Sequence, residues 1–277
     1  DDMHILEEPL RRGTLASVVW GMAMITKRDP KARVLVTPSD QLILQEADYE
    51  NNMLDGLDFV GNEGSLLVMG VKASRPETGY GYIQRGDEIN EKGISKVKTF
   101  SEKPSHEFAE MFVKDGGFLW NTGLQAFRAD VFLDTLCRIV PEYQLGIPRL
   151  MADAESGDAR LVPEVFQMLP NLSLAVGILE RADNVYVKEC SFGWADIGTW
   201  TSIHDDCPAD NQGNVLMDTK AYLYECADNV IRLPKGRIAV VKGLKDYVVA
   251  EEGEILMICP REDVATMRRM HTDTKFM

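Results

Sequence analysis

The sequence lacks the marks of a nucleic-acid-binding, membrane-spanning or disulfide-stabilised protein. Its 30 Lys and Arg residues against 44 Asp and Glu residues give a formal net charge of −14, with no basic stripe. A nucleic-acid polymer is therefore not an expected partner. No apolar run is long enough to span a bilayer, and no signal peptide is recognisable. The five cysteines are widely spaced and form no redox or metal-binding pair. We expect reduced thiols, a cytoplasmic setting and no membrane partner.

The apolar content is sufficient for one large domain or two smaller ones. The 277 residues are 45% hydrophobic, which is ordinary for a globular chain of this length. Periodicity predicts a helix from Thr14, a strand over 33–37, a helix over 41–58 and a strand over 65–71. This alternation predicts an α/β fold with a mainly parallel sheet flanked by helices.

The pattern changes after Trp200 to short strands separated by glycines. These predicted strands cover residues 215–217, 230–233, 238–241, 247–249 and 255–259, and a last helix is predicted over Glu262–Met270. We therefore expect an α/β domain over 1–205 and a small β-rich domain over 206–277. Strands this short bury little surface alone, so we expect them to pack on a neighbour or on a second copy of the chain in a homo-oligomer.

Two aspartates each follow a strand-like run. Asp40 comes after residues 33–37 through a Pro-Ser turn, and Asp196 follows residues 184–188 between two tryptophans. Ligands collect beyond the carboxyl ends of parallel strands, and two carboxylates there can hold one hard cation together with phosphate groups. Taken singly, each Asp is more often simply a turn former.

Two segments carry groups that suit a sugar. Gly79 and Gly81 let the backbone approach a ligand closely, and Tyr80 can provide a wall. Asn121, in an otherwise apolar run, offers both a donor and an acceptor to vicinal hydroxyls. The plainer interpretations are a glycine-rich hairpin and an Asn that caps a turn.

Two other segments carry groups that suit a phosphate or a base. Glu102 and Lys103 precede a proline, and on an extended segment they point to opposite faces, one toward hydroxyls and the other toward a phosphate. Arg12 and the free amides of the helix that begins near Thr14 can meet an anion or a base edge. Taken alone, the Glu-Lys-Pro segment is much more often a solvated charged turn, and the plainer interpretation of the other segment is a helix start with its arginines in water.

The order and spacing of these segments together resemble the bacterial mannose-1-phosphate guanylyltransferases, a family of sugar-phosphate nucleotidyltransferases. The matching segments are Glu8-Pro9 with Arg12 and Thr14, Thr37–Asp40, Arg75–Ile83, Phe100–Pro104, Trp120–Gly123 and Phe192–Trp200. The resemblance implies a Rossmann-like sheet and a reaction of GTP with mannose 1-phosphate that gives GDP-mannose and pyrophosphate. It also implies Mg²⁺ as cofactor.

The resemblance implies a role for each matching residue. Asp40 and Asp196 would hold the catalytic Mg²⁺, and Lys103 would meet the sugar phosphate. Arg12 and Thr14 would lie near the guanine. The sugar would be bound by Gly79, Tyr80, Gly81, Glu102, Asn121 and Gly123.

The sequence departs from the family pattern at several positions. Gly13, Ala175 and Val176 replace an Asn, an Asp and a Tyr, and Gln41 replaces a His. The family opens with a glycine-rich phosphate loop, and the sequence starts downstream of it, so we expect the sequence as it stands not to turn over GTP. Two alternatives remain: a non-catalytic, sugar-nucleotide-binding regulatory homologue, or a nucleotidyltransferase for another hexose 1-phosphate.

Overall fold

The chain forms two compact units. The computed structural model describes residues 5–62, 64–88, 90–156, 161–198, 200–217 and 219–261, together with 263, 267 and 270. The first unit comprises residues 1–38 and 44–192, and the second comprises residues 39–43 and 193–277. The second unit is therefore built from two separate stretches of the chain.

The first unit is organised around a six-stranded mixed sheet with the order β1-β6-β3-β7-β5-β4. Its strands are β1 (Arg33–Val36), β3 (Leu66–Lys72), β4 (Gly81–Glu88), β5 (Ile94–Glu102), β6 (Phe118–Arg128) and β7 (Val185–Cys190). Among the described residues of this sheet, only β3 and β7 pair in parallel, and the other pairings are antiparallel. The expectation of a mainly parallel sheet is therefore wrong. The alternation of helix and strand on which it rested ends at β3, and β4 and β5 then form an antiparallel pair.

The long strand β6 pairs with three other strands. Its residues 118–120 lie beside β4, its residues 125–128 lie beside β1, and both halves pair with β3. Because β4 also pairs with β5, and β5 with β7, the pairings return to β6 and close into a circuit. The sheet is therefore curved around β6 rather than open on both sides.

Strand β6 changes partner where its backbone is irregular. The hydroxyl of Thr122 donates to the carbonyl of Met69 at 2.7 Å, and Oδ1 of Asn121 accepts the N–H of Gly123 at 3.1 Å. Gly123 has φ of 77°, a left-handed conformation that glycine adopts without steric cost. Side chains thus satisfy the backbone groups that a regular ladder would have paired.

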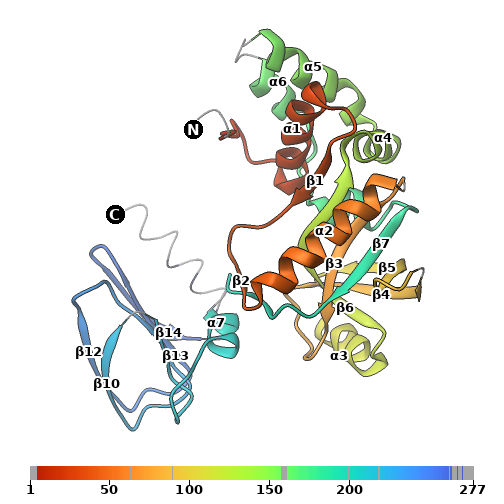
Figure 1. Cartoon of the computed structure of the whole chain (residues 1–277). Helices are drawn as coiled ribbons and strands as arrows, with labels where there is room; N and C mark the ends of the chain where they lie inside the picture. The colour runs from red at the N-terminus through yellow and green to blue at the C-terminus, as the bar shows by residue number, and fades with distance from the viewer. Residues whose placement is uncertain are drawn as a thin grey trace. The chain divides into compact units, whose positions relative to one another are not determined.

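The helices of the first unit pack on this sheet and on one another. They are α1 (Gly13–Arg28), α2 (Glu46–Asn62), α3 (His106–Asp115), α4 (Ala129–Ile139), α5 (Glu142–Ser156) and α6 (Leu161–Met168), with a π-helix η2 (Ala175–Leu179). Helix α2 contacts β1, β3 and β6, whereas α1, α4, α5 and α6 gather together (Figure 1). The core between them includes the fully buried side chains of Leu15, Val19, Phe132, Tyr143 and Phe166.

The first helix follows its sequence pattern. Leu15, Val19 and Met22 recur at helical spacing and are buried, and α1 ends before Pro30. The helix expected over 41–58 differs, since residues Gln41–Ile43 form strand β2 and α2 begins only at Glu46. Strand β2 pairs with the distant strand β8 (Trp194–Asp196), a contact that local periodicity does not reveal.

In its described residues, the second unit contains β2, β8, α7 (Trp200–Asp206) and six later strands. Those strands are β9 (Val215–Met217), β10 (Lys220–Tyr224), β11 (Val230–Arg232), β12 (Ile238–Lys242), β13 (Tyr247–Glu252) and β14 (Ile255–Pro260). The unit begins before the expected boundary at 206, because Ile203 of α7 packs in one core with Val215 and Val230. The helix predicted over Glu262–Met270 lies mostly outside the described residues.

Three of the later strands, β9, β11 and β13, pair in parallel, and we call each stretch of chain that leads from one of them to the next a coil. Val215, Val230 and Val248 lie opposite one another in β9, β11 and β13, and all three are buried. Strands β10 and β12 form a second parallel pair, and β14 joins β13 in antiparallel orientation. Gly213, Asp228 and Asp246 lie just before β9, β11 and β13, and each of these three residues has a left-handed backbone conformation. The coils therefore repeat their geometry although their side chains differ.

Two buried asparagines connect neighbouring coils. Nδ2 of Asn229 donates to Oδ1 of Asn214 at 2.8 Å and to the carbonyl of Leu244 at 2.9 Å. Oδ1 of Asn229 accepts the N–H of Tyr247 at 2.9 Å. Asn229 is fully buried, so no solvent replaces these bonds.

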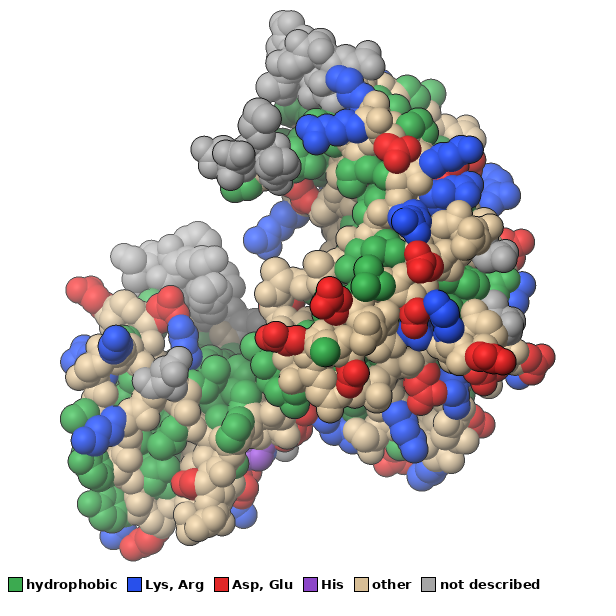
Figure 2. All heavy atoms as spheres, in the orientation of Figure 1, with side chains coloured by type: hydrophobic (Ala, Val, Ile, Leu, Met, Phe, Trp, Pro, Cys, Tyr) green, Lys and Arg blue, Asp and Glu red, His purple; other side chains and the backbone are tan. Residues whose placement is uncertain are grey.

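Charged side chains of both signs are interspersed over the face in Figure 2. Among the described helices, none combines the length and the apolar content that crossing a bilayer requires.

Replacing Asn229 with Ala should destabilise the second unit. The change leaves the part-buried N–H of Tyr247 without this partner, at a cost of about 1–3 kcal/mol, whereas the carbonyl of Leu244 still accepts the N–H of Ala227. Chemical denaturation monitored by tyrosine and tryptophan fluorescence measures the loss. Asn211→Ala, in an exposed turn, is the matched control and should stay within about 0.5 kcal/mol. Equal losses for the two variants would contradict the structural role of Asn229.

Candidate functional site

Three of the residues predicted to bind a sugar meet at Gly81. The register of β4 and β5 places Gly81 opposite Glu102. An ideal Cβ atom on Gly81 would lie only 2.7 Å from Oε2 of Glu102 and 3.3 Å from Cβ of Asn121. The carboxylate of Glu102 therefore lies across the glycine, in space that any other residue at position 81 would occupy.

Asn121 keeps one polar group available in this region. Its Oδ1 is used by the N–H of Gly123, which is the turn-stabilising role that the sequence also allowed. Its Nδ2 group makes no hydrogen bond with any residue that the structure describes. The side chain is therefore fixed through one end while a donor remains at the other.

Lys103 does not extend the strand that carries Glu102. Its φ is 47°, in the left-handed region, so the expected extended arrangement with opposed side chains is wrong. The N–H of Lys103 donates to the carbonyl of Tyr80 at 3.2 Å, and the N–H of Glu102 donates to Oε1 of Glu180 at 3.0 Å. Two hydrogen bonds donated by backbone N–H groups thus hold the left-handed conformation of Lys103, which costs a non-glycine residue about 1–2 kcal/mol.

The carboxyl group of Glu102 lies in an unfavourable environment for its charge. Burial raises its pKa above the usual value of 4.5, the nearby Lys103 ammonium opposes this, and the charge of Glu180 adds to it. A carboxylate in this state favours a ligand that donates hydrogen bonds to it, as hydroxyl groups do.

Aromatic side chains form a rigid border beside Gly81. The rings of Tyr80 and Trp120 meet edge to face with centroids 5.3 Å apart, and both residues are buried. The guanidinium carbon of Arg75 lies 5.2 Å from the centroid of the Trp120 ring. The N–H of Gly79 donates to the carboxylate of Glu77 at 3.0 Å, which closes the turn before β4.

Arg12 and Thr14 use their side chains within the protein. The Arg12 guanidinium donates to the carbonyls of Phe166 and Gln167 in the last turn of α6, at 2.7 and 3.1 Å. A cation there satisfies the orphan carbonyls of a helix end. Oγ1 of Thr14 accepts the N–H of Leu174 at 3.0 Å. The structure does not test the predicted base contacts of these two residues, but it does give each a structural role.

Three of the four departures from the family pattern fall near this same contact, whereas Gln41 lies in β2. Gly13 has φ of 74°, and an ideal Cβ there would lie 2.2 Å from the carbonyl oxygen of Leu172. Ala175 and Val176 follow Leu172 closely in the chain, and the N–H of Val176 donates to the hydroxyl of Ser173. Glycine at position 13 is therefore required by the backbone, whatever its consequence for a ligand.

The two aspartates come together in the second unit. Strands β2 and β8 pair antiparallel, with Gln41 opposite Asp196, so Asp40 precedes β2 at the same end. An ideal Cβ on Gly198 would lie 2.9 Å from Oδ1 of Asp196 and 4.0 Å from Oδ2 of Asp40. Both carboxylates therefore face one small space, although the residues are far apart in sequence.

This donor set suits a magnesium ion that shares its shell with phosphates. Oδ1 of Asp196 accepts the N–H of Gly198 at 2.9 Å, which orients the carboxylate. Among the described residues, no group of three or more His, Cys, Asp or Glu side chains is arranged to hold a metal alone. Mg²⁺ is commonly bound by one or two carboxylates, with waters and substrate phosphates completing the shell.

Comparison with known proteins covers both of these clusters. A family model described as Nucleotidyl transferase matches residues 2–213. The chain belongs to this family. The match includes both Asp40 and Asp196 as well as Gly81, Glu102 and Asn121.

Two curated relatives of this nucleotidyl transferase extend the comparison. The chain is 31% identical over 269 residues to the alginate biosynthesis protein AlgA of Pseudomonas syringae, covering 96% of this chain and 55% of that protein. It is 27% identical over 278 residues to the mannose-1-phosphate guanylyltransferase of Escherichia coli, covering 97% and 59%. The chain thus spans little more than half the length of these relatives.

A solved structure shares the fold of this nucleotidyl transferase. It is a Thermus thermophilus protein described as a mannose-1-phosphate geranyltransferase, with a TM-score of 0.85 and 28% identity. The likeness covers 98% of this chain and 77% of that protein.

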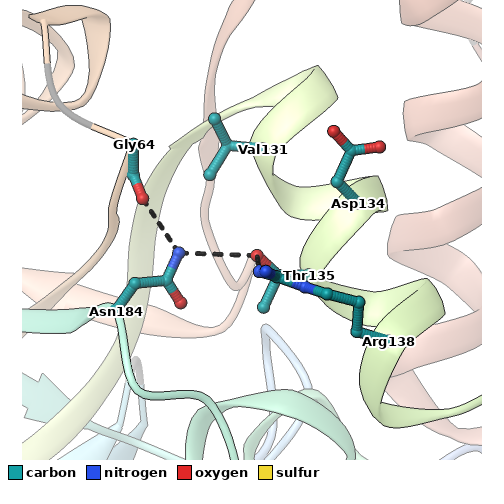
Figure 3. A pocket seen from close by; sticks show the side chains of 6 residues that line it. All are labelled: Gly64, Val131, Asp134, Thr135, Arg138 and Asn184. Atoms are coloured by element: carbon teal, nitrogen blue, oxygen red, sulfur yellow. Dashed lines mark hydrogen bonds between the residues drawn. The ribbon is translucent and has the colours of Figure 1, made fainter.

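A separate hollow of about 460 Å³ lies on the first unit of the nucleotidyl transferase (Figure 3). Its polar groups bond to one another: Nδ2 of Asn184 donates to the carbonyl of Gly64 at 2.9 Å and to Oγ1 of Thr135 at 3.4 Å. Arg138 also donates to Oγ1 of Thr135, at 3.2 Å. None of the described residues lining it belongs to the predicted sites, so we assign it no role.

Sequence reasoning missed Glu180. Glu180 follows the π-helix η2, and its carboxylate accepts a hydrogen bond from the N–H of Glu102. A π-turn has no recognisable residue pattern, so only the structure shows this contact.

Replacing Gly13 with Ala should destabilise the first unit. The left-handed backbone costs about 1–3 kcal/mol for a non-glycine residue, and the new Cβ would meet the carbonyl of Leu172. Gly21→Ala in the same helix is the control: no atom lies within 4 Å, and Ala should stabilise by about 0.5–1 kcal/mol. Urea denaturation compares the two variants. Effects of the same sign would contradict this account.

Replacing Glu102 with Gln should raise stability at neutral pH. Because the folded-state pKa of Glu102 is raised, chiefly by burial, its stabilising contribution is present below the unfolded pKa and is lost as pH rises. The melting temperature of Glu102→Gln should therefore exceed that of the parent at about pH 7 and converge with it toward about pH 4. Exposed Glu88→Gln should show no such trend. A difference that grows as pH falls would reverse the assigned direction.

Proposed function

We propose that the protein transfers a guanylyl group from GTP to mannose 1-phosphate, giving GDP-mannose and pyrophosphate. The observation that carries the proposal is the convergence of Glu102 and Asn121 on Gly81 in a chain of the nucleotidyl transferase family. The names of the Escherichia coli and Thermus thermophilus relatives support mannose 1-phosphate as the sugar substrate.

The residues of the first unit would bind the sugar phosphate. Glu102 accepts hydrogen bonds from sugar hydroxyls, and the remaining Nδ2 donor of Asn121 meets another hydroxyl. Lys103 supplies a positive charge to the phosphate, which offsets the strongly acidic chain locally. Tyr80 and Trp120 border the site and keep the backbone around Gly81 in place.

The chemistry needs positioning rather than a protein nucleophile. An oxygen of the sugar phosphate attacks the α-phosphorus of GTP, a new P–O bond forms, and the bond to the β-phosphate oxygen breaks as pyrophosphate leaves. Lys103 keeps the attacking phosphate charge-neutralised while it approaches another anion. No Ser–His or Cys–His pair is required for such an in-line displacement.

Asp40 and Asp196 would hold Mg²⁺ for the nucleotide. The ion, when bound, neutralises charge on the phosphates during the transfer. The N–H of Gly198 fixes Asp196, so the carboxylate pair is preorganised by β2 and β8.

Pyrophosphate release from GTP and mannose 1-phosphate, measured on a version of the protein that carries the family's N-terminal glycine-rich loop, tests the proposal. Lys103→Ala removes a charge-assisted contact worth about 1.5–3 kcal/mol, so the KM for mannose 1-phosphate should rise about 10- to 150-fold. Asp40→Asn and Asp196→Asn should each shift the Mg²⁺ dependence of turnover to higher concentration. Lys98→Ala and Glu254→Gln, both exposed, are the matched controls and should behave as the parent.

Two results would favour the alternatives. Faster turnover of glucose 1-phosphate than of mannose 1-phosphate would assign the chain to another hexose 1-phosphate. Calorimetric binding of the sugar nucleotide without any pyrophosphate release, by the version that carries the glycine-rich loop, would indicate a non-catalytic homologue.

A further inference from the structure

Glu180 contacts the backbone at the point where Glu102 and Lys103 leave β5. Its Oε1 accepts the N–H of Glu102 at 3.0 Å, across a separation of 78 positions in the chain. The next N–H, that of Lys103, donates to the carbonyl of Tyr80 at 3.2 Å. Two consecutive backbone N–H groups are therefore held by different partners: that of Glu102 by the carboxylate of Glu180, and that of Lys103 by the carbonyl of Tyr80.

The π-helix sets the direction in which Glu180 leaves its segment. The N–H of Glu180 donates to the carbonyl of Ala175 at 3.0 Å, five residues earlier, and the N–H of Ala182 returns to the carbonyl of Ile178 at 2.9 Å. One extra residue in a turn rotates the following side chains by about 100° around the helix axis. The wide turn therefore changes the face on which Glu180 lies, and π-turns of this kind are frequent at functional sites.

The segment that Glu180 holds is strained. Lys103 has φ of 47°, which a lysine adopts only where its surroundings determine it. Strand β5 ends at Glu102, so the sheet no longer fixes the backbone beyond this residue. The bonds to Glu180 and Tyr80 are thus the described contacts that define the turn.

The contact places two carboxylates beside each other. The charged groups that face Glu102 are Lys103, which favours its ionised form, and Glu180, which disfavours it. An amide oxygen would accept the same N–H without this repulsion. The bond to the Glu102 backbone therefore requires an oxygen acceptor at position 180 and not its negative charge.

We infer that Glu180 is a positioning residue of the sugar-phosphate site. Its carboxylate fixes the backbone of Glu102 so that Lys103 stays in the left-handed turn and its ammonium group is presented to the substrate phosphate. This inference rests on the proposed function, since it assumes that Lys103 meets a hexose 1-phosphate.

Calorimetric titration with mannose 1-phosphate tests the inference on the purified protein. Glu180→Ala should weaken binding by about tenfold, because the lost hydrogen bond releases the turn. Glu180→Gln retains the acceptor and should keep the affinity within about threefold of the parent. Glu164→Ala, an exposed glutamate of α6, is the control and should leave binding unchanged. Melting temperatures show whether each variant is folded.

A double-mutant cycle separates positioning from a general structural effect. If Glu180 acts through Lys103, Glu180→Ala should cost little further affinity once Lys103→Ala is present. Should Glu180→Ala fail to fold, Glu180→Asp, which shortens the side chain by one methylene, replaces it in the cycle. Full additivity, or unchanged affinity in Glu180→Ala, overturns the inference while leaving the proposed function intact. A parent protein that binds no hexose 1-phosphate overturns both.

Discussion

The irregularity in β6 is the constraint on which the first unit depends. Strand β6 pairs with β4 through its first residues and with β1 through its last residues. It can do so only because its hydrogen-bond ladder is interrupted between the two. Thr122 and Asn121 supply the hydrogen bonds that the interruption removes, and Gly123 supplies the backbone conformation. Asn121 lies beside Gly81, at the point where the pairing of β6 with β4 ends. The site is a product of the sheet's own geometry.

Most of the polar groups in the candidate site are engaged at one end by the protein itself. Asn121 is tied to Gly123, Asp196 to Gly198, and the backbone of Glu102 to Glu180. Such ties reduce the freedom that a ligand would otherwise have to remove, since the groups are already oriented before binding. The cost appears as strain at Lys103 and as a destabilised carboxylate at Glu102, the pattern expected where function opposes stability.

The sequence predicted what depends on local pattern and missed what depends on distant partners. Helix α1 and strands β1 and β3 follow from apolar spacing, whereas the three residues of β2 gain their structure only from β8. The antiparallel pairings of the sheet were not predicted either, since the order of helices and strands in the sequence does not indicate the direction in which a later strand runs. Collinear motifs grouped Gly81, Glu102 and Asn121, and the structure places them together. The structural uses of Arg12 and Thr14 were not predictable, because their partners lie 154 and 160 positions away.

The second unit is assembled from two stretches, and this has a consequence for how such chains can recombine. The chain passes between the units after residues 38, 43 and 192, so no single junction separates them. A crossover anywhere between residues 44 and 192 would carry β8 from one parent and retain β2 from the other. Asp40 and Asp196 would then be inherited separately. The carboxylate pair therefore depends on two separate stretches of the chain. A recombinant that exchanges one contiguous segment keeps the pair only if both parents supply compatible β2 and β8 strands.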